Sequence, residues 1–156
     1  MASADAVGSN LPDSFGNFAI ARVTGASLAT AGNAVVAIPF FQGGLTNGNA
    51  LATSGQVIIR RVTVQNANAS ASLANVNITT TNDGNTSNAV VATVSLANLT
   101  AVNRFQDLTV ASPYALTTTV NGANTSTLYL NVTNAASAIV DIRIYGDSVS
   151  FSWKSM

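Results

Sequence analysis

The feature that most constrains this chain is a succession of short apolar runs, rich in Val, Ile and Thr and bounded by turn-forming residues. β-Branched residues favour strands, whereas Gly, Asn and Ser favour the turns between them. We find no stretch with the apolar period of an α-helix. The sequence therefore predicts strands at residues 18–24, 34–41, 57–65, 73–81, 89–96, 105–110, 115–120, 127–133, 138–145 and 148–153.

Turn signals separate these runs, and they are Gly43-Gly44, Asn47-Gly48, Ser54-Gly55, Asp83-Gly84 and Asn121-Gly122. Many short strands with turns at intervals of roughly 8–15 residues are typical of a sandwich, jelly roll or barrel. A chain of 156 residues is the size of one domain and can bury a core without disulfides. We therefore expect an all-β, jelly-roll-like antiparallel β-sandwich over residues 18–156. Residues 1–17 are small, polar and aperiodic, and we expect them to form an extended N-terminal arm.

The last part of the chain changes its alternation. Up to residue 144 the bulky set has even numbers and lies opposite Asp141, Arg143 and Tyr145, whereas from Val149 onward it has odd numbers. A regular strand has a period of two, so one inserted residue accounts for the switch of the bulky residues from even to odd positions. We predict a β-bulge at residues 145–147, and the alternative is a tight turn between two strands.

Two further signals concern local geometry. Pro39 lacks a backbone donor, so its strand should lie at a sheet edge or contain a bulge. The run TTTNDGNTSNAVV (residues 79–91) is typical of a hairpin tip, because Asp-Gly suits a turn that needs positive φ.

Residues 82–88 also suggest a calcium loop, but they contain a single carboxylate, Asp83, whereas calcium loops bring several together. We therefore expect a plain turn and no metal.

Composition excludes most enzyme chemistry. The chain has no His, no Cys and no Glu, which removes the Ser-His-Asp and Cys-His arrangements and the commonest metal ligands. We expect no catalytic residue and no cofactor. Charged residues make up 8% of the chain and the formal net charge is zero, so little repulsion keeps copies of the protein apart.

The distribution of charge and of apolar residues also bears on partners. The five arginines and Lys154 are dispersed along the sequence, which argues against a nucleic-acid partner. The longest apolar runs are too short to span a membrane. The first residues lack the basic and apolar regions of a signal peptide.

Arg60-Arg61 is the most informative charged pair. Adjacent strand residues point to opposite faces, so one of the two arginines could point toward apolar neighbours. A buried arginine needs a carboxylate, and Asp107, Asp141 and Asp147 are the available candidates. The alternatives are an inter-strand or inter-subunit ion pair and a sheet end at which both guanidinium groups reach water.

Phe40-Phe41, beside Gly43-Gly44, is the best candidate for an exposed apolar contact, because one of two adjacent rings must face away from the core. We expect the other aromatic residues to pack mainly in the core. The complete set of interface candidates is Phe15, Phe40, Phe41, Arg60, Arg61, Asp141, Arg143 and Tyr145.

Two stretches carry a resemblance: RVTGASLATAGNAVVAIPF (22–40) and VDIRIYGDSVSF (140–151). Together with the Asn-, Thr- and Ala-rich composition, they resemble the decoration (cement) proteins on capsids of tailed bacteriophages, notably cyanophage-like examples. The resemblance implies a homo-oligomer, with a trimer favoured, that binds the major capsid protein on the outside of the virion after assembly in the host cytoplasm. No functional residue is implied position by position.

Two other functions fit the same residues. The first is a receptor- or carbohydrate-binding β-sandwich of a phage tail or fibre, which would expose aromatic residues near its loops. The second is a jelly-roll shell subunit or surface-layer component, which would assemble by itself.

Overall fold

The computed structural model describes residues 19–39, 55–111, 114–118 and 127–150. Within these residues the chain forms strands and one single-turn 3-10 helix, η3 (Thr86–Asn88), with no α-helix. The strands are β1 (Ala19–Ser27), β2 (Gly32–Pro39), β3 (Gly55–Gln65), β4 (Asn75–Thr79), β5 (Ala89–Ser95), β6 (Phe105–Leu108), β7 (Tyr114–Thr118), β8 (Thr127–Asn134) and β9 (Ile139–Ser150). The two strands predicted at residues 138–145 and 148–153 are one strand, β9, so the alternative of a tight turn at residues 145–147 is wrong.

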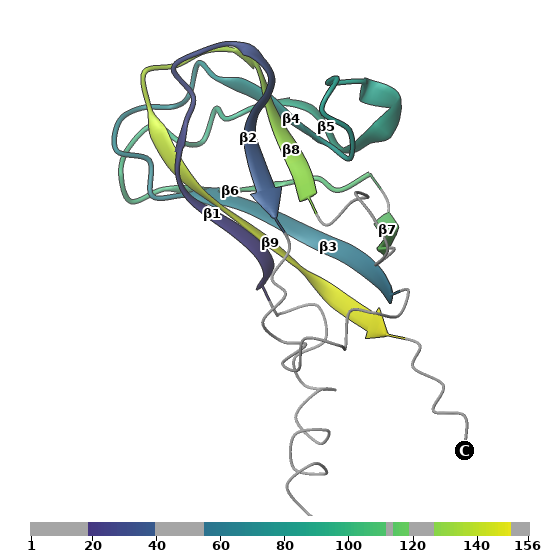
Figure 1. The fold of residues 1–156 in the computed structure, drawn as a ribbon. Coiled ribbons are helices and arrows are strands. Elements are labelled where there is room, and N and C mark those ends of the chain that lie inside the picture. The colour runs from purple at the N-terminus through teal and green to yellow at the C-terminus, as the bar shows by residue number, and fades with distance from the viewer. Residues whose placement is uncertain (1–18, 40–54, 112–113, 119–126, 151–156) are drawn as a thin grey trace, which may run out of the picture.

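The strands form two layers (Figure 1). The first is a five-stranded sheet in the order β1-β9-β3-β6, in which β7 also pairs with β3. The second is a four-stranded sheet in the order β2-β8-β4-β5. All strand pairs within the sheets are antiparallel, so the predicted all-β sandwich is confirmed.

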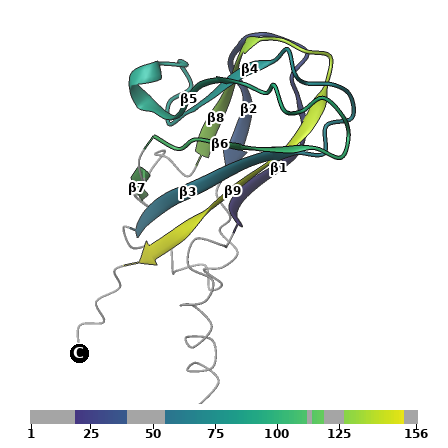
Figure 2. The same ribbon diagram turned by 180° about the vertical axis from the view of Figure 1, so that it is seen from behind.

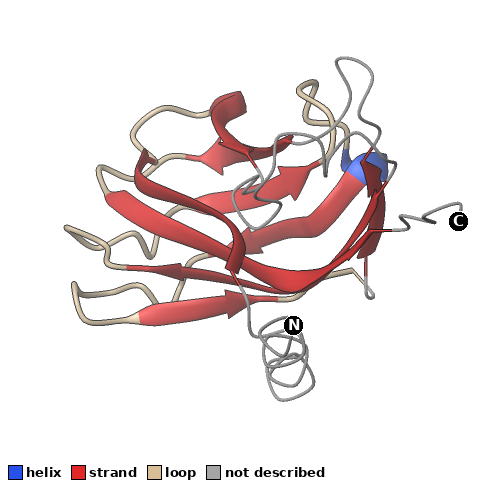
Figure 3. Cartoon of the chain, turned by 60° about the horizontal axis from the view of Figure 1, so that its bottom comes forward, coloured by secondary structure: helices blue, strands red, loops and turns tan. Residues whose placement is uncertain are grey.

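The chain passes repeatedly from one sheet to the other. Antiparallel pairs join β1 with β9, β2 with β8, β3 with β6, and β4 with β5. The loops 28–31, 66–74, 96–104 and 135–138 meet at one end of the sandwich, on the left of Figure 3. They bond to one another through their backbones: the Leu28 N–H donates to the Ala138 carbonyl oxygen at 2.9 Å, and the Leu96 N–H donates to that of Ala74 at 2.9 Å.

The described core is entirely aliphatic. Alternation along each strand sends one set of residues inward, and its largest fully buried members are Leu28, Ile38, Ile59, Ile78, Leu96, Leu99, Leu128, Leu130, Ile142, Ile144, Val62 and Val64. The expectation of core aromatics is wrong for the described residues. Tyr129 and Tyr145 are half-buried on outward positions, because they alternate with inward leucine and isoleucine neighbours.

A bulge lies where the sequence predicted one, but the extra residue belongs to the neighbouring strand. Ile59 pairs with Gly146 and Arg61 pairs with Tyr145, so β3 contributes the unpaired Arg60 at this point. β1 is also irregular there, with one residue more than β9 between Ala19 and Ala21. A Cβ on Gly146 would collide with the Ile58 carbonyl oxygen, so the close approach of the two backbones requires glycine.

The two other local predictions can also be compared with the structure. Pro39 ends β2, an edge strand that pairs with β8, as its missing N–H requires. β4 and β5 form the expected hairpin, and Gly84 has a φ of 70°. The connection is longer than a tight turn and contains η3. The predicted arm 1–17, the candidates Phe15, Phe40 and Phe41, and the turn signals at residues 43–44, 47–48 and 121–122 lie outside the described residues.

Candidate functional site: the outer face of the five-stranded sheet

Charge divides the two sheets. The four-stranded sheet has no Asp, Glu, Lys or Arg in any of its strands. Every charged residue that belongs to a strand lies in the five-stranded sheet, and these are Arg22, Arg60, Arg61, Asp107, Asp141, Arg143 and Asp147. Four of the five arginines are therefore brought into one sheet, although the sequence disperses them. Of these seven, Asp147 alone has a side chain outside the described part of the structure.

The register arranges the outward side chains in rows across β1, β9, β3 and β6. The central row contains Arg22, Arg143, Thr63 and Asp107, each paired with the next. Like charges that face each other directly destabilise a sheet, so the pairing of Arg22 with Arg143 is unfavourable in the isolated protein.

The adjacent row contains Arg61 and Tyr145, which are paired across β3 and β9. The Arg61 guanidinium carbon lies 4.4 Å from the centroid of the Tyr145 ring, within the range of a cation–π contact. Arg60 and Arg61 are both exposed, because the bulge interrupts the alternation between the buried Ile59 and Val62. The interpretation in which one of the pair points toward apolar neighbours is therefore wrong. Both arginines are exposed, as the alternative expected, but they lie within β3 and not at a sheet end.

Asp141 stabilises the backbone of the sheet. One carboxylate oxygen, Oδ1, accepts from the Gly25 N–H at 3.0 Å, and the other, Oδ2, accepts from the Asn66 side-chain amide at 2.8 Å. Gly25 and Asn66 have positive φ values of 73° and 54°. Gly25 lies at a register shift in β1, and Asn66 follows the last residue of β3. Asp141 therefore holds two irregular backbone positions, a role that an exposed aspartate would not have.

Asp107 and Arg143 differ in whether their charged groups have a hydrogen-bond partner. Asp107 accepts a hydrogen bond from the Thr63 hydroxyl, which is buried beneath the outward side chains. Arg143 is half-buried, yet its guanidinium has no hydrogen bond or ion pair within the part of the chain that the structure describes. A partly desolvated cation without a partner is costly, so Arg143 is the side chain on this face whose bonding is least satisfied.

Sequence reasoning missed the most exposed aromatic residue of this face. Phe105, at the start of β6, is 65% exposed, and Ile139, at the start of β9, is 43% exposed. The signal was present in the alternation: Gln106 and Leu108 are buried, so Phe105 has the outward parity. Phe105 also borders an open depression of about 480 Å³, lined by Ala97, Asn98, Thr100, Asn103, Arg104 and Phe105.

Part of the outer face of the four-stranded sheet is covered by a loop of the same chain. The loop 80–88, with η3 beside β5 (Figure 2), reaches the start of β2, where the Asn33 side-chain amide donates to the Asp83 carbonyl oxygen at 2.8 Å. Beneath it lie Thr79 and Asn131, whose side chains point outward yet are 0% and 1% exposed. The loop therefore covers this face around Thr79 and Asn131, whereas Thr133 on the same face is exposed.

Asn131 connects the covered network. Its amide oxygen accepts from the Ala34 N–H at 2.6 Å, and its amide nitrogen donates to the Thr79 hydroxyl at 2.9 Å. Ala34 has a φ of 48°, which is unfavourable for a residue with a Cβ. Asn77, also buried, has one side-chain oxygen without a hydrogen-bond partner.

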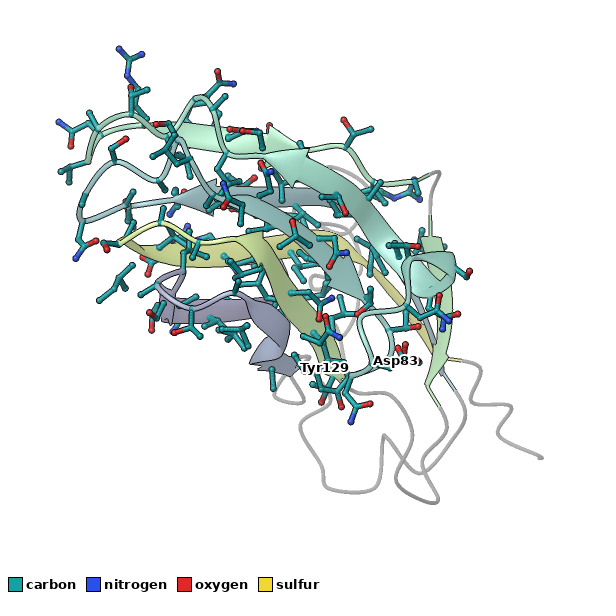
Figure 4. All side chains as sticks on the ribbon, turned by 90° about the horizontal axis from the view of Figure 1, so that it is seen from above. Asp83 and Tyr129 are labelled. Atoms are coloured by element: carbon teal, nitrogen blue, oxygen red, sulfur yellow. The ribbon has the colours of Figure 1, made fainter. Side chains whose placement is uncertain are left out.

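Asp83 is held by the loop that contains it (Figure 4, where Asp83 and Tyr129 are labelled). Hydrogen bonds from the Thr81 hydroxyl and the Asn85 N–H lower the pKa of Asp83 below its ordinary value of 3.8. The described residues contain no group of three or more acidic, His or Cys side chains that could bind a metal ion. The geometry around Asp83 is that of a turn closed by its own carboxylate.

No protein-family model, curated protein or solved structure matches this chain. The described residues form no helix of the length and apolar character needed to cross a membrane.

Proposed function

We propose that this protein is a non-enzymatic virion protein that binds the outside of an icosahedral phage capsid and stabilises it as a decoration protein. The observation that carries the proposal is the outer face of the five-stranded sheet. In a chain with 8% charged residues, this face combines four arginines with Tyr145 and the exposed Phe105. Arginine and aromatic residues are the types enriched where proteins meet.

The strand order supports a jelly roll. If β7 is set aside as an addition, the remaining eight strands pair first with last, second with seventh, third with sixth and fourth with fifth. This is the order produced when one long antiparallel hairpin wraps around a common core. Viral capsid proteins use this architecture, although lectins and cupins share it, so the fold alone does not decide the function.

Stabilisation would follow from mass action. A protein that binds the assembled shell, and not its separated subunits, shifts the equilibrium toward the shell. A homo-oligomer, such as the expected trimer, would make several contacts at once and would dissociate more slowly than one copy. The sandwich, with one outer face partly covered by a loop and with the exposed charged and aromatic residues on the other, suits a protein that binds through a single face.

Mass spectrometry of purified virions, with the copy number of this protein measured against the major shell protein, tests the proposal. We expect a copy number that is a simple multiple of the icosahedral sites. Particles washed at high salt, which screens contacts between charged groups, should lose shell stability in proportion to the copies removed. Absence of the protein from purified particles would contradict the proposal.

A specific observation favours one second candidate, a carbohydrate-binding module. The open depression beside Phe105 combines two asparagines, one arginine and one exposed ring, which are groups that bind sugars through hydrogen bonds and stacking. A glycan array with wild-type protein and the Phe105→Ala variant distinguishes this candidate. Binding that depends on Phe105 would favour the carbohydrate-binding module over the decoration protein.

The other alternative, a jelly-roll shell subunit, is tested by asking whether the purified chain assembles by itself into closed particles.

A further inference from the structure

We infer that the outer face of the five-stranded sheet binds a carboxylate-bearing segment of a partner protein, with Arg143 and Arg61 as the two receiving cations. The inference rests on the proposed function, because it names the chemistry that the capsid surface must supply. Arg22 and Arg60 lie on the same sheet, but each already has an interaction of its own, so the argument uses Arg143 and Arg61.

The first step is the position of Arg143. It pairs with Arg22 on β1 and with Thr63 on β3, so a cation lies on one side and a buried hydroxyl on the other. The Thr63 hydroxyl already donates to Asp107. The nearest carboxylate along β9, Asp141, uses both oxygens for Gly25 and Asn66. An external carboxylate would therefore supply the partner that Arg143 lacks among the described residues.

The second step is the orientation of Arg61. Its guanidinium carbon lies over the Tyr145 ring, 4.4 Å from the centroid, and a guanidinium in such a contact typically stacks with one flat face against the ring. The N–H donors of a guanidinium lie in its plane, which leaves them directed away from the ring. Stacking therefore holds Arg61 in one orientation and lowers the entropy lost when a carboxylate binds it in the two-point geometry typical of arginine.

The third step places the two cations together. Arg143 pairs with Thr63, and Arg61 is two residues before Thr63 on β3, so the two arginines are diagonal neighbours on one face. Diagonal neighbours are roughly 7–8 Å apart at their Cα atoms, which long side chains readily bridge. One or two carboxylates of a single segment could therefore meet both.

The same face disfavours a nucleic acid. Phosphate-backbone binding relies on many cations acting together, and a protein of that class neutralises about 6–10 phosphates. This face has four arginines and also presents Asp107 and Asp141, which would repel a continuous polyanion. Phe105 and Ile139 beside the charged rows add exposed apolar area of the kind that a protein partner covers.

Titration of the ¹⁵N-labelled full-length protein with hexaglutamate, followed by NMR, tests the inference. We expect shifts confined to β9, β3 and β1, and a dissociation constant raised at least about tenfold in Arg143→Glu and in Arg61→Glu. Ala92→Glu is the control, since Ala92 is an exposed residue of β5, in the other sheet, and the variant should bind as the wild type does. Arg143→Lys should keep part of the affinity, because it retains charge and loses the two-point geometry.

Several results would overturn the inference. Equal binding by wild type, Arg143→Glu and Ala92→Glu would show that the peptide does not use this face. Tighter binding of a six-nucleotide oligo-dT than of hexaglutamate would indicate a phosphate-bearing partner instead. A change of sedimentation coefficient in Arg143→Glu without peptide would identify the face as a contact between copies of the chain. The amide spectrum of each variant, compared with that of the wild type, shows whether the variant is folded.

The two proposals fail separately. If the protein is found on purified capsids but hexaglutamate does not bind, the decoration function stands and the carboxylate inference falls. If hexaglutamate binds in the expected manner and the protein is absent from virions, the carboxylate inference stands without the decoration function.

Discussion

The outer faces of the two sheets differ in their residue types and in how far they are buried. The four-stranded sheet carries amide and hydroxyl groups there and covers them with the loop 80–88, so that Thr79 and Asn131 are buried. The five-stranded sheet carries arginine, aspartate and tyrosine there and leaves them exposed or half-buried. A region whose buried polar groups are hydrogen-bonded within the chain, with the Asn77 side-chain oxygen as the exception, serves stability. A face that leaves Arg143 without a partner among the described residues serves recognition, at a cost to the isolated molecule.

The largest expected effect is a loss of stability when a glycine of the five-stranded sheet is replaced, compared with a glycine of the four-stranded sheet. Gly146→Ala in β9 places a Cβ against the Ile58 carbonyl oxygen, so β9 and β3 must move apart. We expect a loss of about 3 kcal/mol or more in the free energy of unfolding, measured by urea denaturation. Gly32→Ala in β2 is the control, because its Cβ would meet Val35 at an ordinary 3.6 Å. Equal losses in the two variants would refute the close approach at Gly146.

The next effect tests the covered face. Asn131→Ala removes the acceptor of the Ala34 N–H and the donor to Thr79, leaving buried polar groups unsatisfied. We expect a loss of about 2 kcal/mol in the free energy of unfolding, measured in the same way. Thr133→Ala lies on the same strand and the same side but is exposed, and it should change stability by less than about 0.5 kcal/mol. A loss in Thr133→Ala as large as in Asn131→Ala would show that the cover adds nothing.

The smallest effect concerns pH and the loop that forms the cover. The folded-state pKa of Asp83 is lowered, so the ionised carboxylate contributes stability above its ordinary pKa of 3.8, and this contribution is lost as pH falls through the lower folded value. Thermal unfolding from pH 7 downward should therefore show wild type slightly more stable than Asp83→Asn at neutral pH. The difference should vanish in the acid range below 3.8. A difference that stays constant with pH would mean that the Asp83 charge does not act in the loop.

Much of the fold could be predicted because alternation is a local property. The runs at residues 57–65, 89–96 and 127–133 match β3, β5 and β8 to within two residues at each end. The bulge could also have been assigned to β3 from its own sequence. Val57 and Ile59 share one parity, Val62 and Val64 share the other, and Arg60-Arg61 separates them. The same alternation, applied to residues 105–108, would have placed Phe105 outward.

The candidate site could be predicted only in part, because it depends on pairing between distant segments. Arg22 and Arg143 become neighbours through the register of β1 with β9, and nothing local in either strand specifies that register. The contact of Asn33 with the Asp83 carbonyl, which closes the other face, is also non-local. Asp141 was a candidate partner for arginine, yet it accepts hydrogen bonds from Gly25 and Asn66. The sequence could not predict these contacts, because the positive φ values of the two residues are not visible in it.

The absence of aromatic rings from the described core has a practical consequence for spectroscopy. In most proteins the near-ultraviolet signals of tyrosine report on the packed interior and disappear when it melts. Here Tyr145 and Tyr129 lie on the outside of the two layers, and Tyr145 is in contact with a cation. The part of the near-ultraviolet circular dichroism that is lost in Tyr145→Phe should therefore respond to docking of a partner while the interior stays unchanged, so that the unlabelled protein can report its own occupancy.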